Sequence, residues 1–254
     1  MVYAWVMQRC ALVVALAGCG FHGAEVSDAR VIDTPVDMIV DQRDPDMTAS
    51  TFCDPMTGLV ACYEFEGTAN DATANRLDAT VTNVMFPPTG QVGSAMLIAA
   101  NSSATVAAST KFDVAQLTIE AWIQPSTLPA PTKIAVVLDV DNQYALWITD
   151  TGAVTCDLKG STRLSTTVTV PILAWSHVAC TYDATAIARI YVNGSVAVTR
   201  NGTHDLVMTG PAMAIGGNSP SGSPLVGLID QVRLLSVARS GPQICSDAGQ
   251  SSCL

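Results

Sequence analysis

The sequence predicts an all-β protein whose main domain is a sandwich of two antiparallel sheets. From residue 59 almost to the end of the chain, short apolar runs alternate with turn residues, a pattern typical of a sandwich or jelly roll. No window of a dozen residues holds a helical period, apart from a turn or two in "SGPQICSDAG" (residues 240–249). Apolar residues make up 49% of the 254-residue chain and charged residues 13%, so the chain can bury a sizeable core.

Residues 1–18 predict a signal peptide rather than an element of the fold. Arg9 is their only charge, and the apolar run "CALVVALAG" (residues 10–18) is too short to span a bilayer as a helix. The run ends in "LAGC" (residues 16–19), which resembles the lipobox of bacterial lipoprotein signal peptides. The resemblance implies cleavage before Cys19, a diacylglycerol on its thiol, and a lipid anchor in the outer membrane or at the cell surface of a bacterium. A plain secretory signal cut near Ala17 is the alternative.

Residues 19–52 predict an extended tether that begins at the lipidated Cys19. Residues 25–50 carry seven acidic residues and two arginines, are interrupted by prolines, and show no sustained period of helix or strand. Because like charges repel along the segment, we expect it to stay extended. An extra edge strand from "RVIDTPVDMIV" (residues 30–40) is the alternative. The β-sandwich domain then occupies residues 53–254.

The clearest strands are short apolar runs bounded by turn residues, at residues 59–66, 117–123, 134–140, 143–149 and 189–198. Asn193-Gly194 divides the last run and is a strong hairpin signal. "WSHVACTYD" (residues 175–183) also predicts a strand, although it carries several reactive side chains. Alternation along that strand places His177 and Cys180 on opposite faces, so they cannot act together as a nucleophile and its base.

Export accounts for the cysteines. Once residues 1–18 are removed and Cys19 is acylated, six cysteines remain, and an even number in an exported protein predicts three disulfides among fifteen possible pairings. We expect the three pairs of sequence neighbours, Cys53–Cys62, Cys156–Cys180 and Cys245–Cys253, with Cys156 and Cys180 as near neighbours in one sheet. Zinc is not expected, because the chain has no CxxC pair and its three histidines are widely scattered.

Several separated motifs carry a family resemblance. They are "LVACYEFEGTANDATANRLDATV" (residues 59–81), "LTIEAWIQP" (117–125), "AWSHVACTYD" (174–183), "ARIYVNGSVAV" (188–198) and "GLIDQVRLLSVARS" (227–240). In this order they resemble the laminin-G-like, concanavalin A-like jelly-roll domain of bacterial surface proteins. The resemblance implies a concanavalin A-like jelly roll over residues 59–240. It leaves function open, because this fold hosts lectins, enzymes and adhesion modules.

The charge balance narrows the range of partners. The chain has 22 acidic and 12 basic residues, a formal net charge of −10, and such a chain repels phosphate backbones, so we expect no nucleic-acid partner.

We expect a lipid-anchored, non-catalytic cell-surface module that binds or adheres to a glycan or a surface protein. Tyr144 and the turn at residues 139–142 are candidates for the rim of a binding site. Strand alternation favours core positions for Trp122, Trp147 and Trp175.

A glycoside hydrolase of the concanavalin A-like glucanase type is the alternative function. Glu64 and Glu66 would lie on one face of a strand, roughly 7 Å apart by strand rise, which suits a pair of catalytic carboxylates. The glycanases of the family use a denser acidic strand than "YEFE". The sequence also lacks the GxSxG and HExxH motifs of serine hydrolases and metalloproteases.

One structural calcium ion is predicted. "EFEGTANDATAN" (residues 64–75) gathers oxygen ligands in a turn that contains glycine. Alternation in "GLIDQVRLL" (residues 227–235) places Asp230 on the apolar face, where a carboxylate needs a cation or a full set of hydrogen bonds. The family resemblance places the loop against this strand, often with calcium between them. The expected ligands are Glu66, Asp71 and Asp230, with Asn70 or Asn75. The alternative is that Asp230 accepts hydrogen bonds from backbone N–H groups of a turn.

Overall fold

The computed structural model describes residues 52–159, 162–205, 209–217 and 224–253. The predicted signal peptide, the lipidated Cys19 and the tether up to residue 51 lie outside these residues. By its contacts the chain divides into two units, Met1–Met47 and Thr48–Leu254, and every described residue belongs to the second. Among the described residues, no helix is long and apolar enough to cross a membrane.

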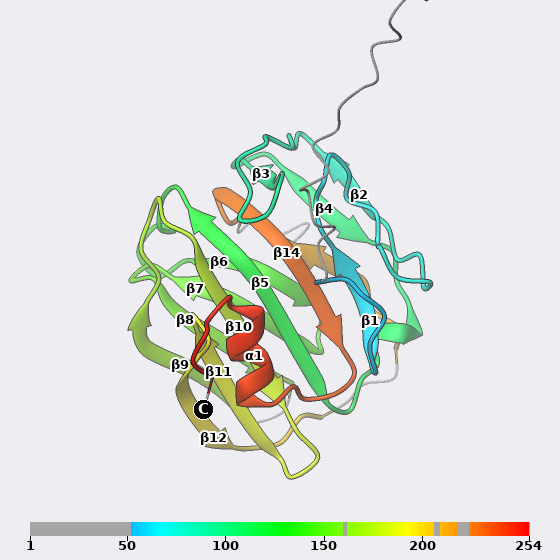
Figure 1. Ribbon diagram of the computed structural model, residues 1–254, viewed down its shortest axis with the longest axis vertical. Coiled ribbons are helices and arrows are strands. Elements are labelled where there is room, and N and C mark those ends of the chain that lie inside the picture. Colours follow the sequence, from blue (N-terminus) through cyan, green and yellow to red (C-terminus); the bar gives the residue numbers. More distant parts are fainter. Residues whose placement is uncertain (1–51, 160–161, 206–208, 218–223, 254) are drawn as a thin grey trace, which may run out of the picture. The chain divides into compact units, whose positions relative to one another are not determined.

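The predicted all-β sandwich is confirmed: the described strands form two antiparallel sheets (Figure 1). Sheet 1 contains, in spatial order, β1 (Leu59–Tyr63), β14 (Gly227–Leu235), β5 (Leu117–Pro125), β10 (Ser176–Tyr182), β11 (Ile187–Val192) and β12 (Ser195–Asn201), and β3 (Met96–Ile98) pairs with β14. Sheet 2 contains β2 (Ala79–Thr82), β4 (Ser103–Val106), β13 (Met213–Ile215), β6 (Ile134–Val140), β7 (Tyr144–Thr149), β8 (Ala153–Leu158) and β9 (Thr162–Thr169). A 3-10 turn (Thr110–Phe112) and the helix α1 (Gly241–Asp247) complete the elements.

The core lies between the two sheets. Alternate residues of β5, such as Leu117, Ile119 and Ile123, point into it and are fully buried. Strand β10 is buried on both faces. As predicted, its two reactive side chains diverge, because Cys180 belongs to the core while His177 packs against Trp122 on the outer face of sheet 1. Residues 175–183 are therefore scaffold.

All three predicted disulfides are present: Cys53–Cys62, Cys156–Cys180 and Cys245–Cys253. The expected position of the second one is wrong. Cys156 lies in β8 of sheet 2 and Cys180 in β10 of sheet 1, so this bridge joins the two sheets through the core instead of neighbouring strands of one sheet.

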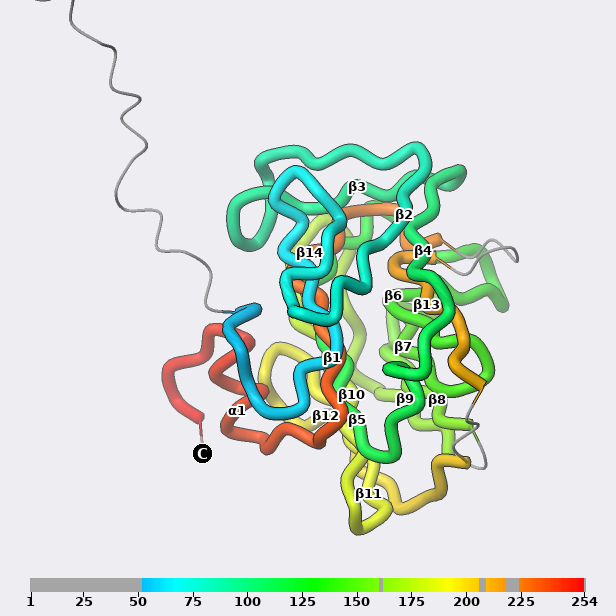
Figure 2. The backbone as a smooth tube through the Cα atoms, turned by 90° about the vertical axis from the view of Figure 1, so that its right-hand side faces the viewer, coloured from blue at the N-terminus to red at the C-terminus, as the bar shows by residue number. Residues whose placement is uncertain are grey.

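The outer face of sheet 1 is covered by the two ends of the domain. Arg233, on β14, is 1% exposed, and its Nε donates to Glu120 Oε1 at 2.7 Å. The same guanidinium lies 2.6 Å from Asp247 of α1, donates to the carbonyl oxygen of Phe52 at 2.7 Å, and stacks over the Phe52 ring. His177 Nε2 lies 3.3 Å from Glu120 Oε2. A buried ionic cluster therefore holds both ends of the domain to one sheet, on the side away from β6–β9 (Figure 2).

A bulge in β14 changes which side chains share a face. Gln231 has φ +49°, and the pairing with β5 slips between Asp230 and Arg233. Both of these charged side chains consequently lie on the outer face of sheet 1, whereas Val232 and Leu234 point into the core. The prediction that Asp230 shares the core face with Val232 and Leu234 is wrong, because regular alternation does not continue through the bulge.

Candidate functional site

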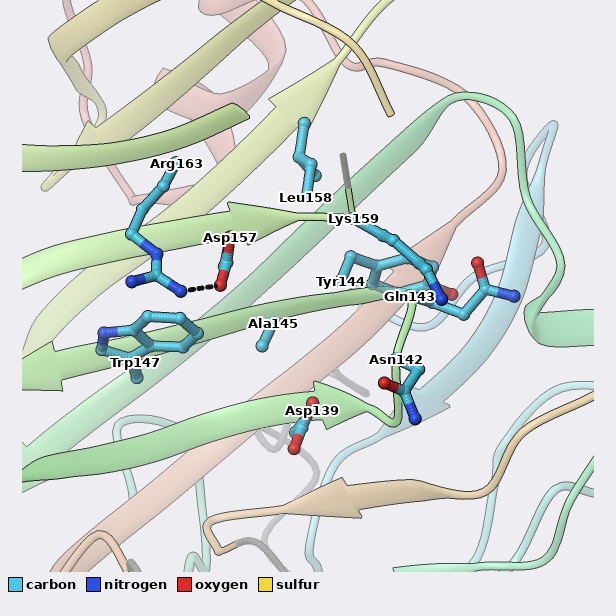
Figure 3. A pocket seen from close by; sticks show the side chains of 10 residues that line it. All are labelled: Asp139, Asn142, Gln143, Tyr144, Ala145, Trp147, Asp157, Leu158, Lys159 and Arg163. Atoms are coloured by element: carbon cyan, nitrogen blue, oxygen red, sulfur yellow. Dashed lines mark hydrogen bonds and ion pairs between the residues drawn. The ribbon is translucent and has the colours of Figure 1, made fainter. Parts of the chain in front are cut away.

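A pocket of about 320 Å³ lies on the outer face of sheet 2, over strands β6 to β9 (Figure 3). Ten residues line it: Asp139, Asn142, Gln143, Tyr144, Ala145, Trp147, Asp157, Leu158, Lys159 and Arg163. No helix of the described chain covers this face, in contrast to the outer face of sheet 1. The pocket is therefore a candidate for a binding site.

The strand register builds the floor of the pocket. Asp139, Ala145, Asp157 and Arg163 are directly paired across β6, β7, β8 and β9, so their side chains project from the same face of the sheet. Ala145 is the smallest of the four and lies between the two carboxylates. The short side chain leaves a hollow with a carboxylate on either side (Figure 3).

Trp147 and Arg163 form one wall. Trp147 follows Ala145 by two residues on β7 and is partly exposed, and the guanidinium of Arg163 lies over its indole ring, 5.3 Å from the ring centroid. Arg163 also forms an ion pair with Asp157, which compensates the charge of that carboxylate. The expectation that Trp147 lies in the core is wrong, because β7 turns Leu146 and Ile148 inward instead.

Asp139 differs from Asp157 in having no partner within the described part of the chain. No described residue donates a hydrogen bond to its carboxylate or forms an ion pair with it. Partial burial, followed by the nearby charges of Asp141 and Asp157, raises the pKa of Asp139 to about 6. The pocket thus contains one compensated and one uncompensated carboxylate.

The opposite end of the pocket is built from the β6–β7 turn and the end of β8. Asn142 adopts φ +61° in this turn. Gln143 donates from Nε2 to Asp113, and the Tyr144 hydroxyl donates to the carbonyl oxygen of Phe112 at 2.9 Å. Lys159 lies beside Gln143 (Figure 3), and its ammonium forms no ion pair with a described residue. Of the predicted rim, Asp139, Asn142 and Tyr144 do line the pocket.

The predicted calcium ligands fall into two groups. Glu66 accepts a hydrogen bond from the backbone N–H of Ser94, and Asp230 accepts from the N–H groups of Val92 and Gln231. Both carboxylates therefore bind the loop at residues 91–94. Burial first, and Glu66 in addition, raise the pKa of Asp230 to about 7 against the hydrogen bonds that lower it.

The other predicted ligands are turned towards their own loop. Asp71 accepts hydrogen bonds from the backbone N–H groups of Cys62, Thr73 and Leu77. Asn75 donates to the carbonyl oxygen of Val60, and Asn70 is exposed. Within the described ranges, no three His, Cys, Asp or Glu side chains gather as metal ligands. The calcium ion stays a prediction, and Glu66 with Asp230 is the pair that the fold brings together.

The predicted glycanase pair lies elsewhere. Strand β1 ends at Tyr63, and Phe65 adopts φ +55°, so Glu64 and Glu66 are not successive outward positions of one strand. Neither lines the pocket. The site residues predicted from the sequence do not include Asp157, Lys159 and Arg163 of the pocket, although polar side chains at spaced positions of two successive strands were the available signal.

Comparison with known families agrees with this architecture. The sequence profile of the laminin G family of the concanavalin A-like lectin/glucanase superfamily matches residues 99–245. The chain belongs to this family, as the motifs indicated. No curated protein sequence matches the chain.

Solved structures share the fold at low sequence identity. Domain 4 of AbnA, an extracellular GH43 arabinanase from Geobacillus stearothermophilus in complex with arabinotriose, has a TM-score of 0.64 and 19% identity, over 77% of this chain and 100% of that one. The binding domain of Paraclostridial Mosquitocidal Protein 1 has a TM-score of 0.63 and 16% identity, over 78% and 52%. A structure of botulinum neurotoxin type C, a toxin whose cell entry depends on interaction with two ganglioside molecules, has a TM-score of 0.56 and 13% identity, over 76% and 51%. The chain thus spans the whole arabinanase domain and about half of the toxin chains.

Proposed function

We propose that this domain is a non-catalytic carbohydrate-binding module displayed at the cell surface, and that the pocket on sheet 2 holds the sugar. The observation that carries the proposal is the hollow over Ala145, with Asp139 and Asp157 beside it and Trp147 as a wall. Binding sites for small molecules combine apolar walls with a few polar groups that fix orientation.

The pocket matches the two kinds of surface that a sugar presents. Sugar hydroxyls donate hydrogen bonds, which the carboxylate of Asp139 has free acceptor capacity to receive. The C–H face of a sugar ring is apolar and packs on an aromatic side chain such as Trp147. Asn142 and Lys159 add donors at the far end of the pocket.

The structural neighbours support the class of ligand. One was solved with arabinotriose and another is linked to gangliosides, so carbohydrate ligands recur on this fold. Because their identity to this chain is below 20%, they supply the ligand class and no residue roles.

The test is glycan-array binding by the oxidised chain from residue 20 onwards. We expect at least one glycan to bind, and Trp147→Ala to abolish the binding. The matched control is Trp122→Ala, which removes a partly exposed tryptophan from the outer face of the other sheet and should keep binding. Circular dichroism of both variants checks folding. Loss of binding in both folded variants, or in neither, would refute the pocket on sheet 2 as the site.

Membrane attachment through Cys19 is the second part of the proposal, and it rests on "LAGC". Stable anchoring requires more than one acyl chain. We expect Cys19→Ser to abolish lipidation, which mass spectrometry of the exported chain would detect. A variant that still carries the lipid mass would contradict attachment at Cys19.

The glycoside hydrolase remains the competing function, and reducing-end release from β-glucans and arabinans distinguishes it. We expect no release. Release that Glu64→Gln or Glu66→Gln abolishes would instead support the predicted glutamate pair, and release sensitive to Asp139→Asn would place catalysis in the pocket.

A further inference from the structure

We infer that the pocket selects glycans that carry free amino groups, and that Asp139 is the residue that receives the ammonium group. This inference rests on the proposed carbohydrate-binding function and names its ligand class. It follows from which charges in the pocket are already paired and which are not.

The two carboxylates beside Ala145 are not equivalent. Asp157 is paired with Arg163, whereas no described residue pairs with Asp139. Two strand spacings separate the Asp139 and Asp157 backbones, or about 9.6 Å, and only the methyl group of Ala145 lies between them. A ligand group that enters between the two carboxylates can therefore reach that of Asp139 from the open side.

An ammonium group is the chemical complement of such a carboxylate. A partly buried anion without a partner is unfavourable, and an N–H donor that carries a positive charge forms shorter and stronger hydrogen bonds than a neutral hydroxyl or amide. N-acetylation of an amino sugar removes that charge and adds bulk, so an acetylated sugar cannot compensate Asp139.

The positive side chains of the pocket do not compete at this position. Arg163 is held by Asp157 and Trp147, and Lys159 lies at the other end, beside Gln143 (Figure 3). Asp141 adds a second negative charge near Asp139 and helps to raise its pKa. The Asp139 end of the pocket is therefore negative.

The charge of the whole domain acts in the same direction. Residues 53–254 contain nine Lys and Arg residues against fifteen Asp and Glu, a formal charge of −6. A field of this sign concentrates cationic ligands near the surface and repels sugars that carry carboxylates. Both local and long-range electrostatics favour an amino sugar.

The test compares glucosamine oligomers with N-acetylglucosamine oligomers of the same length and linkage. Calorimetric titration of the chain from residue 20 onwards is carried out near neutral pH, with excess chelator to exclude bridging by cations. We expect the glucosamine oligomers to bind at least about tenfold more tightly, as one charge-assisted hydrogen bond permits. Asp139→Asn should abolish this preference, and the matched control Asp54→Asn, which removes an exposed carboxylate outside the pocket lining, should keep it.

Other outcomes would show whether the amino-sugar preference, the role of Asp139 or the proposed function is wrong. Equal binding of both oligomers with dependence on Trp147 overturns the amino-sugar inference and leaves the proposed function intact. A preference that survives Asp139→Asn overturns the role of Asp139. An oligolysine peptide that binds as tightly as the glucosamine oligomer shows recognition of charge alone and overturns the glycan class. Failure of every glycan on the array to bind overturns the proposed function itself.

Discussion

At the scale of single residues, the position of a charge decides what it can do. Asp139 and Arg233 are both drawn away from bulk water, but Arg233 is matched by Glu120 and Asp247 while Asp139 has no partner among the described residues. The pairing of Arg233 stabilises the fold, whereas the unpaired carboxylate of Asp139 can form a new favourable interaction with a ligand.

The raised pKa of Asp139 predicts a dependence of stability on pH. Because the folded-state pKa is about 6 and the unfolded value is near 4, the folded state binds the proton more tightly. The contribution of Asp139 to stability is therefore most favourable below about pH 4 and is lost as the pH rises through about 6. We expect Asp139→Asn to raise the thermal midpoint at pH 7.5 and to change it little at pH 4. A pH-independent difference between variant and parent would contradict the burial of this carboxylate.

Replacing Arg233 should lower the stability of the fold, whereas replacing Asp139 should raise it at neutral pH. Arg233→Met leaves the buried Glu120 without its closest cation, and breaking a buried pair in this way costs about 3–5 kcal/mol. The matched control is Arg163→Met, which removes an ion pair whose arginine side chain is 65% exposed and should cost less than about 1 kcal/mol. Urea unfolding of both variants measures the difference, and similar losses for the two arginines would show that the cluster adds little.

At the scale of elements, the β11–β12 hairpin shows how a two-residue turn determines register. Asn193 and Gly194 have φ of +48° and +80°, the mirror-image turn that their sequence predicts. Asn193 Oδ1 also accepts a hydrogen bond from the N–H of His177, which ties the turn to β10.

Gly194→Ala tests this turn. A Cβ there has an unfavourable φ and would approach Cys245 Cα to 3.0 Å, so we expect a loss of more than about 1–2 kcal/mol. Gly67→Ala is the control, because Gly67 has φ +77° and no atom within 4 Å of the added Cβ. Denaturant unfolding should show a larger loss at Gly194, since only Gly194 adds a steric contact to the backbone strain.

The loop that contains Glu66 and the bulged strand β14 meet at the proposed calcium position. We expect calcium to raise the thermal midpoint, with about 2.7 kcal/mol of stabilisation at a hundredfold excess over its dissociation constant. Asp230→Asn should remove the effect. An unchanged midpoint in calcium and in chelator would eliminate the ion.

The sequence predicted those elements that depend on residues close together in the chain. Residues 134–140 match β6 in full, and the Asn193-Gly194 hairpin and the three disulfide pairs are confirmed. Alternation did not predict which face of β7 points outward, because each face of that strand carries apolar side chains. The bulge at Gln231 depends on one backbone angle, and the contact between Arg233 and Glu120 spans 113 residues. Neither leaves a local pattern.

At the scale of the whole domain, the ends and the pocket belong to different layers. The first described residues and α1 lie against sheet 1 (Figure 2), while the residues that line the pocket belong to sheet 2 and its turns. The disulfide between Cys156 and Cys180 couples these layers through the core, so the face that carries the pocket rests on the same framework that secures the ends.

This placement of the ends has a practical consequence for how the domain can be attached to a solid support. A tag ahead of residue 52 would fasten the domain by the side opposite its pocket and leave the pocket facing the solution. Random amine coupling would also attach some molecules through Lys159, which lines the pocket. In those molecules the pocket would face the support and be blocked. A sensor surface prepared through the N-terminal tag should therefore retain more accessible pockets than one prepared by amine coupling.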